Sequence, residues 1–271
     1  MIRKTDEVNK QIAELEYKNY EINELIKTEQ GFKVGRVLDV NDNRSGNGEQ
    51  IYAIASDGSN VLLNAPLSER AKVKEITLLY RGSTNPLGLF TGKADEVGRD
   101  WVGNNAALGI KMLMNQRGVT GQLEASAEYL KEIMEKYPNA KINIYGHSLG
   151  SMDAQYALAC ITDYSRINGA YIYNGPNIYS LLSYSQKVNV SALYAKIHNY
   201  VDSEDIIGLG YNKGEGAVGQ VYKFVGLDKK TVPMLVGKEI AGPLGAMLGL
   251  AYGAFADQHI WGGYDSMQTV I

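Results

Sequence analysis

The strongest constraint on the fold is a serine flanked by glycines at the junction of a predicted strand and a predicted helix. Lys141–Tyr145 reads as a short strand, and residues from Leu149 onward have the apolar spacing of a helix. Between them runs Gly-His-Ser-Leu-Gly, with Ser148 at its centre. A serine on such a sharp turn presents its Oγ above a sheet, and glycines two residues away allow the close packing that the turn requires. The segment therefore predicts an α/β protein with Ser148 as a nucleophile.

A serine nucleophile needs a histidine base and a carboxylate that orients it. In a fold with this kind of turn, the chain order is serine, acid, histidine. Two histidines follow Ser148. His198 lies within the predicted strand Leu193–Tyr200, which favours a structural role, whereas His259 lies in a predicted loop and is the better base. His147, inside the turn, is expected to pack beside the site.

The acid is expected just after a strand that lies between the serine and the base. Three carboxylates follow Leu193–Tyr200, namely Asp202, Glu204 and Asp205. The residues alone leave the choice among them open.

Composition excludes several classes of function. The net charge is −3, and there is no excess of basic residues that would indicate a nucleic-acid partner. Cys160 is the only cysteine, which rules out an intramolecular disulfide framework and a cysteine-rich zinc site. Three histidines leave little material for a metal centre. We therefore expect neither a metal nor a cofactor.

The first 30 residues are predicted to form an N-terminal helical extension, followed by one domain over residues 31–271. Apolar residues at heptad-like spacing, including Val8, Ile12 and Leu15, predict a helix from about Asp6 to Lys27. The first interpretation is a helix laid on the main domain. The alternative is half of a coiled coil with a protein partner of the immunity or chaperone type.

The pattern of the main domain changes along its length. Phe32–Val40, Gln50–Ser56 and Val61–Asn64 are predicted strands separated by polar turns. From Val73 onward, strands alternate with helices, which favours parallel strands joined by helical crossovers. The predicted fold class is thus α/β, with a mostly parallel central sheet and flanking helices.

The N-terminus lacks the apolar core of a cleavable signal peptide. This leaves a cytoplasmic location or export by a leaderless route. Tyr17/Glu21 and Tyr20/Glu24 have the Y-x-x-x-E spacing that resembles the export tags of type VII secretion substrates. Frequent Lys, Asn, Ile and Tyr are typical of an AT-rich bacterial genome.

One apolar run precedes the predicted base. Ile240–Ala256 has no charged residue, and Gly245, Gly249 and Gly253 recur four residues apart. On a helix these glycines would form one stripe for close packing. We expect a buried helix, and the alternative is a mobile apolar cap that contacts lipid.

Motifs in a consistent order resemble the class 3, or fungal-type, lipase family. Leu79–Ser83 resembles a strand that ends in F-R-G-[ST], and Asp100–Asn104 resembles D-W-x-x-[ND]. Tyr137-Pro138, followed by Ile142–Gly150, resembles the Y-P, strand and G-H-S-L-G run of that family. The resemblance covers Ile76–Ala159. It implies an α/β-hydrolase fold, a Ser-Asp-His triad, ester hydrolysis and no metal.

The resemblance also implies roles for individual residues. Ser148 matches the nucleophile and His259 the final histidine. Asp205, in Asp-Ile-Ile, matches the family's acid best, with Asp202 as the alternative. Ser83 matches the oxyanion-hole residue, and Leu149 would supply the second backbone N–H.

Two departures from the family pattern stand out. Ser151 replaces the usual glycine, which crowds the start of the helix. Thr84–Arg99 is long and rich in glycine, and it reads either as a lid or as a surface loop.

The predicted function is hydrolysis of acyl esters of lipids, of the lipase or phospholipase A type. The expected partners are a lipid or phospholipid substrate and a transient membrane surface. One alternative is an esterase or thioesterase acting on a soluble acyl substrate. Another is a binding module that has the hydrolase fold without catalysis.

Overall fold

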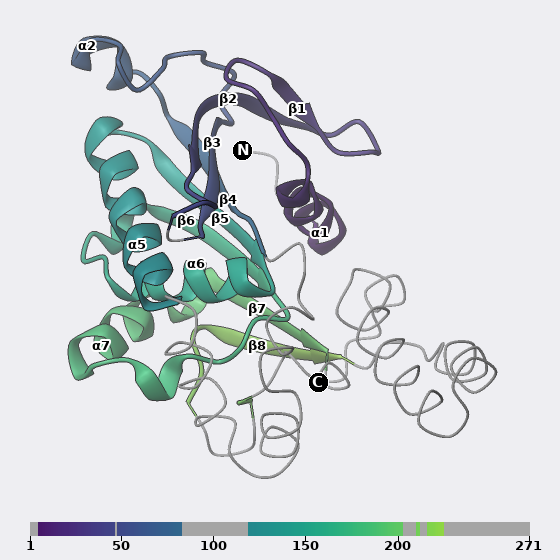
Figure 1. Ribbon diagram of the computed structural model, residues 1–271, viewed down its shortest axis with the longest axis vertical. Coiled ribbons are helices and arrows are strands. Elements are labelled where there is room, and N and C mark those ends of the chain that lie inside the picture. Colours follow the sequence, from purple (N-terminus) through teal and green to yellow (C-terminus); the bar gives the residue numbers. More distant parts are fainter. Residues whose placement is uncertain (1–4, 47, 83–118, 203–209, 212–215, 225–271) are drawn as a thin grey trace, which may run out of the picture.

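The computed structural model describes residues 5–46, 48–82, 119–202, 210–211 and 216–224. The described residues form one eight-stranded sheet with helices on both faces (Figure 1). Several residues and segments named above lie outside the described ranges: Ser83, Thr84–Arg99, Asp100–Asn104, Glu204, Asp205, Ile240–Ala256 and His259.

Strand order in the sheet follows chain order. Neighbouring strands run antiparallel from β1 to β4 and parallel from β4 to β8. The strands are β1 (Leu25–Lys27), β2 (Lys33–Asp42), β3 (Gln50–Ala55), β4 (Glu75–Tyr80), β5 (Lys141–His147), β6 (Ile167–Tyr173), β7 (Ile197–Asp202) and β8 (Gln220–Phe224). This mostly parallel sheet with flanking helices confirms the α/β fold class predicted from the sequence.

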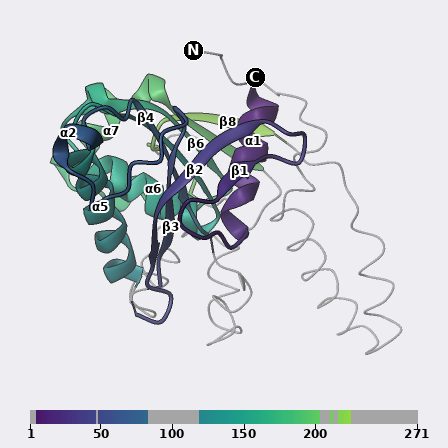
Figure 2. The same cartoon turned by 90° about the horizontal axis from the view of Figure 1, so that it is seen from above.

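The helices form two layers around the sheet. The α-helices are α1 (Asp6–Glu14), α2 (Leu67–Arg70), α5 (Val119–Lys136), α6 (Leu149–Ala159) and α7 (Tyr184–Ala192). Short 3₁₀ turns are η1 (Leu15–Tyr17), η3 (Tyr164–Arg166), η4 (Tyr179–Leu181) and η5 (Tyr194–Lys196). The helices α5, α6 and α7 cover one face, and α1 covers the other (Figures 1 and 2).

Each face of the sheet has its own core because side chains alternate along a strand. On β5, Ile142 and Ile144 join the core beneath α5 and α6, whereas Tyr145 joins the core beneath α1. The α1 side is rich in tyrosine, and its rings stack across neighbouring strands, as Tyr173 and Tyr200 do with centroids 4.9 Å apart. Burial on both faces explains why these strands read as nearly continuous apolar runs.

The predicted N-terminal helix is wrong beyond Glu14. Asn23 takes a left-handed conformation with φ 71°, and Leu25–Lys27 pairs with β2 as strand β1. Ile26 is buried through this strand pairing, and so the apolar spacing that suggested a continuous helix is satisfied by two different elements. The part that is helical lies on the sheet with Ile12 fully buried, in line with the first interpretation.

Two strand predictions also need correction. Val61–Asn64 is not a strand, since β3 already has β2 and β4 on its two sides and the carbonyl of Val61 instead accepts the Tyr137 hydroxyl at 2.7 Å. The strand predicted at Leu193–Tyr200 begins later and ends later, as β7. Asp202 is therefore the last residue of the strand and not part of the following loop.

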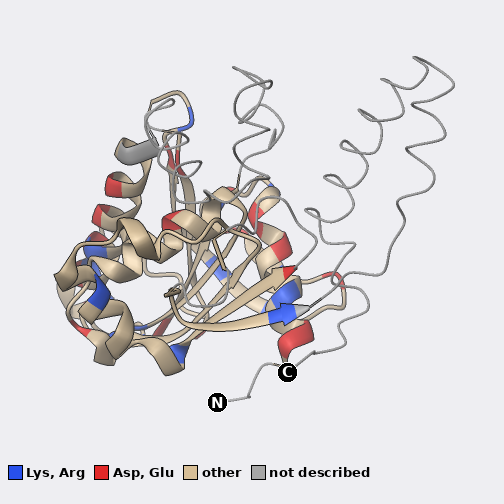
Figure 3. Cartoon of the chain, turned by 90° about the horizontal axis from the view of Figure 1, so that it is seen from below, with Lys and Arg blue, Asp and Glu red and all other residues tan. Residues whose placement is uncertain are grey.

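Charges of both signs are interspersed over the described part of the chain, as Figure 3 shows. Within these ranges, no helix combines the length and the apolar character needed to cross a bilayer.

Candidate active site

The site is built around the turn between β5 and α6. Ser148 is fully buried and has φ 57° and ψ −124°. Non-glycine residues rarely adopt this region, and such strain costs on the order of 1–3 kcal/mol. The turn is anchored on both sides, because the Ser148 N–H donates to the carbonyl of Tyr173 at 2.9 Å and its own carbonyl accepts from Met152 N–H at 3.3 Å. A strained and anchored serine at a helix N-terminus is the geometry of a nucleophile elbow.

The two glycines of the elbow are required by close backbone contacts. A Cβ on Gly150 would lie 2.0 Å from the carbonyl oxygen of Tyr80, at the end of β4. A Cβ on Gly146 would lie 2.5 Å from the carbonyl oxygen of Gly150. The elbow can therefore sit against β4 only if both positions lack a side chain.

Ser151, at a position where the family resembled by the sequence has glycine, is accommodated by another glycine. A Cβ on Gly175 would lie 2.3 Å from the Oγ of Ser151. Gly175, in the loop after β6, thus leaves the space that the Ser151 side chain occupies. Gln155 then links the two segments, since its Nε2 donates to Ser151 Oγ at 3.4 Å and to the Pro176 carbonyl at 2.9 Å.

The end of β4 leads toward the predicted oxyanion residue. Arg81 is largely buried, and its Nη1 donates to Gln50 Oε1 at 2.6 Å and to Asn19 Oδ1 at 2.9 Å. Gly82 follows and is the last described residue before Ser83.

Glu16 and Tyr17, from the N-terminal segment, contact the strand ends beside the site. One carboxyl oxygen of Glu16 accepts the backbone N–H of Gly82 at 3.1 Å and that of His147 at 3.2 Å. The Tyr17 hydroxyl shares a 2.6 Å hydrogen bond with Nδ1 of His147. Burial raises the pKa of the Glu16 carboxyl well above its usual range, although the two backbone hydrogen bonds oppose the shift. Sequence reasoning missed Glu16, because its partners are far away along the chain.

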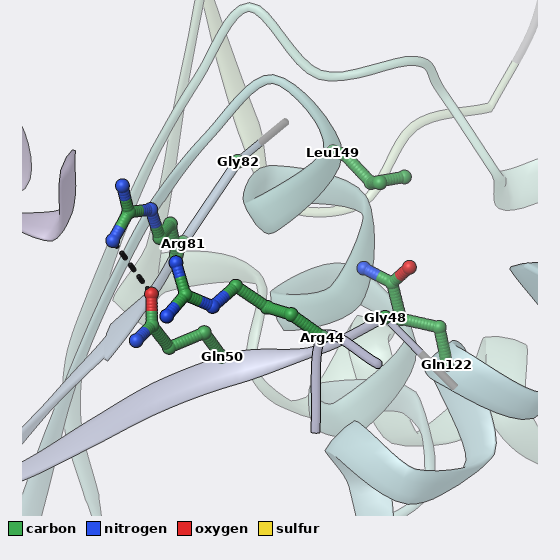
Figure 4. Close-up of a pocket in the computed structure, with 7 residues that line it drawn as sticks. All are labelled: Arg44, Gly48, Gln50, Arg81, Gly82, Gln122 and Leu149. Carbon is green, nitrogen blue, oxygen red and sulfur yellow. Dashed lines mark hydrogen bonds between the residues drawn. The ribbon is translucent and has the colours of Figure 1, made fainter. Parts of the chain in front are cut away.

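A cavity of about 200 Å³ lies beside the elbow. It is lined by Arg44, Gly48, Gln50, Arg81, Gly82, Gln122 and Leu149. Figure 4 shows Arg81 hydrogen-bonded to Gln50, with Leu149 and Gln122 on the other side. Four of these seven described residues have polar side chains, and Leu149 is the large apolar one.

A buried acid, Asp153, binds one of the residues that line this cavity. The Oδ2 of Asp153, on α6, accepts Gln122 Nε2 at 2.7 Å. Burial raises the pKa of Asp153 to about 8. Asp153 could not be singled out from the sequence, because acids on a helix usually face water.

One candidate acid is described. Asp202 is fully buried at the carboxyl end of β7, and its backbone N–H donates to Asn174 Oδ1 at 2.8 Å. Since β5, β6 and β7 are parallel, Asp202 lies at the same edge of the sheet as Ser148. Asp205 is outside the described residues, as is His259.

His198 lies near the opposite end of β7. Its ring stacks between Tyr171 and Tyr222, with centroids 5.0 Å and 5.8 Å away, and burial lowers its pKa. Asp202 is four residue steps further along the strand, about 13 Å away at ~3.3 Å per residue. This placement fits a structural residue. Among the described side chains, no cluster of three or more His, Cys, Asp or Glu could hold a metal ion.

One protein-family model matches part of the chain. Residues 108–219 match the model of a family described as Mbeg1-like, a class 3 lipase-like family. The matched segment includes β5, the elbow and α6, and it confirms the resemblance predicted from the sequence motifs. No protein in a search of curated proteins matches the chain.

Several solved lipase structures are similar to the chain at low sequence identity and with TM-scores below 0.5. A triacylglycerol lipase whose catalytic centre is described as a serine protease triad is 13% identical, with a TM-score of 0.37 over 71% of this chain and 66% of that one. The Rhizomucor miehei lipase–propeptide complex is 15% identical, with a TM-score of 0.41 over 74% and 60%. Lip2 lipase from Yarrowia lipolytica is 14% identical, with a TM-score of 0.41 over 79% and 76%. The chain thus spans less than two thirds of the length of the first two.

Proposed function

We propose that this protein is a serine ester hydrolase that cleaves acyl esters of lipids, as a lipase or a phospholipase A does. The observation that carries the proposal is the strained, buried Ser148 at the N-terminus of α6. Its backbone conformation is costly, and strain of this kind persists mainly where function needs it. The match to a class 3 lipase-like family supports an ester hydrolase at a coarse level.

In the proposed mechanism, Ser148 Oγ attacks the ester carbonyl while His259 takes its proton. The backbone N–H groups of Ser83 and Leu149 would stabilise the oxyanion of the tetrahedral intermediate. Asp205 would orient His259, with Asp202 as the alternative acid. His259 then protonates the leaving alcohol, and water hydrolyses the acyl-enzyme by the same sequence of steps.

A second candidate is an esterase that acts on a soluble acyl substrate. The observation in its favour is that polar side chains, among them Arg44, Gln50 and Arg81, line the described part of the cavity beside Leu149. An acyl pocket for long chains would be lined by apolar residues. A series of p-nitrophenyl esters of increasing chain length, assayed with and without lipid vesicles, separates the two. A lipid hydrolase gains activity with chain length and with an interface, whereas a soluble esterase does not.

The triad is tested by substitution. S148A and H259A should each lower turnover by ~10⁴-fold or more, because triad members act as a unit. H198A, the matched histidine control, should retain most activity. D205N should be far more damaging than D202N if Asp205 is the acid, and the reverse ranking would assign the role to Asp202.

A fluorophosphonate probe separates catalysis from a mere binding module, because it labels only an activated serine. Labelling of the wild type and not of S148A is expected. Wild-type protein that neither labels nor hydrolyses any ester would refute the catalytic proposal.

A further inference from the structure

The N-terminal segment joins the two strand ends that frame the proposed oxyanion hole. Gly82 directly precedes Ser83 at the end of β4, and His147 directly precedes Ser148 at the end of β5. Both backbone N–H groups donate to the same carboxyl oxygen of Glu16, at 3.1 Å and 3.2 Å. A single side-chain atom therefore fixes the spacing between the two strand ends.

Neighbouring residues reinforce this link. Asn19 Oδ1 accepts from Arg81 at 2.9 Å, and the Tyr17 hydroxyl reaches His147 Nδ1 at 2.6 Å. The fit around Gly82 is tight, since a Cβ there would lie 2.4 Å from the Tyr17 hydroxyl oxygen. Glu16, Tyr17 and Asn19, which we call the N-terminal bracket, thus contact the segments on both sides of the hole.

We propose that Glu16 is a positioning residue for catalysis, because its carboxyl group holds the ends of β4 and β5 at the separation that lets the Ser83 and Leu149 N–H groups stabilise one oxyanion. The inference rests on the proposed ester hydrolase function. Leu149 begins α6 two residues after His147, so a shift of the β5 end would carry its N–H away from the oxyanion.

The surroundings of Glu16 indicate that its ability to accept hydrogen bonds, and not its negative charge, positions the strand ends. Its carboxyl is fully buried, and the charged or titratable side chains that act on it are Arg81 and Tyr17, whereas His147 reaches it through its backbone N–H. Because burial raises its pKa, the side chain holds a proton over a wider pH range than an exposed glutamate does. A neutral amide of the same shape can accept both backbone N–H groups, and glutamine should therefore replace it.

The test compares E16A, E16Q and a matched control, N9A. Asn9 is also a buried polar residue of the N-terminal segment, and its Oδ1 accepts the Tyr145 hydroxyl at 2.9 Å without touching the elbow. Each variant is assayed for kcat and KM on a soluble p-nitrophenyl ester, with thermal unfolding measured in parallel. Losing one oxyanion donor costs about 10²–10³ in rate, so a partial displacement should cost roughly tenfold or more.

We expect E16A to lower kcat at least about tenfold in folded protein, with KM changed less than about threefold. E16Q should restore kcat to within about threefold of wild type, and N9A should lower the melting temperature while keeping kcat within the same range. Should E16A fail to fold, E16D carries the test, because its shorter side chain cannot reach both N–H groups.

Two results would overturn the inference. Folded E16A or E16D with the same kcat as N9A would show that Glu16 only stabilises the fold. E16Q as impaired as E16A would show that accepting the two N–H groups is not what matters. A third result, wild-type protein inactive on every ester, would instead refute the proposed function on which the inference rests. It is distinguishable from the first two, because both of those require an active wild type.

Discussion

Replacing Gly150 by alanine should disable the site through a backbone collision. The added Cβ would lie 2.0 Å from the carbonyl oxygen of Tyr80, and real Cβ contacts are essentially never below 3.0 Å. The start of α6 must therefore retreat from β4 by at least about 1 Å. Rotamer changes cannot relieve the clash, because both partners are main chain. Overpacking of this kind costs ~1–3 kcal/mol, which outweighs the ~1 kcal/mol that alanine gains over glycine in a helix.

The same displacement predicts the loss of rate. A 1 Å misplacement of catalytic groups can cost about 10²-fold. We expect G150A to lose roughly 100-fold in kcat on a p-nitrophenyl ester and a few degrees in melting temperature. The control is G169A on β6, where the added Cβ would meet only the Tyr171 ring, at 3.1 Å. Wild-type turnover and stability in G150A would refute the packing argument for the elbow.

Three further predictions follow from the described residues. S148G should be more stable than S148A by about 1 kcal/mol in urea unfolding, because glycine relieves the strain at φ 57°, and both should be inactive. Burial raises the pKa of Asp153 to about 8, so the native state keeps a proton that the unfolded chain releases near pH ~4. The free energy of unfolding should therefore fall between pH 4 and 8 by up to ~1.4 kcal/mol per pH unit. The variant D153N should flatten this slope. Arg166 donates to three backbone carbonyls around the end of α5, and R166M should cost ~2–4 kcal/mol in the same assay.

The elbow could be predicted from sequence because its causes are mostly local. Close backbone contacts within the turn and with the neighbouring strand leave no room for a side chain at Gly146 or Gly150. Both positions must therefore be glycine, which produces a short motif that can be recognised in the sequence. Strands β2 and β3 were predictable within two residues, since burial on both faces leaves apolar runs bounded by polar turns.

The N-terminal segment could not be predicted in the same way. Its apolar spacing fits one helix, but tertiary contacts divide it between α1 and strand β1. Pairing with β2 buries Ile26, while Ile22 between the two elements is half exposed. A repeat of apolar residues indicates that a segment is buried, and it cannot show whether a helix or a sheet edge buries it.

The N-terminal bracket shows the same limit for the site. Glu16 and its two backbone partners are 66 and 131 residues apart along the chain, and no local pattern could pair them. In sequence, a glutamate near the end of an amphipathic helix indicates a solvated surface, because such residues are almost never fully buried unless paired. Here the Glu16 carboxyl accepts hydrogen bonds from two backbone N–H groups in place of water. Without Glu16, those N–H groups at the strand ends would need water molecules as partners. The segment that was predicted as an N-terminal extension therefore completes the polar contacts of the strand ends. A protein truncated to residues 31–271 should have a lower melting temperature and, if the proposed function holds, a lower turnover.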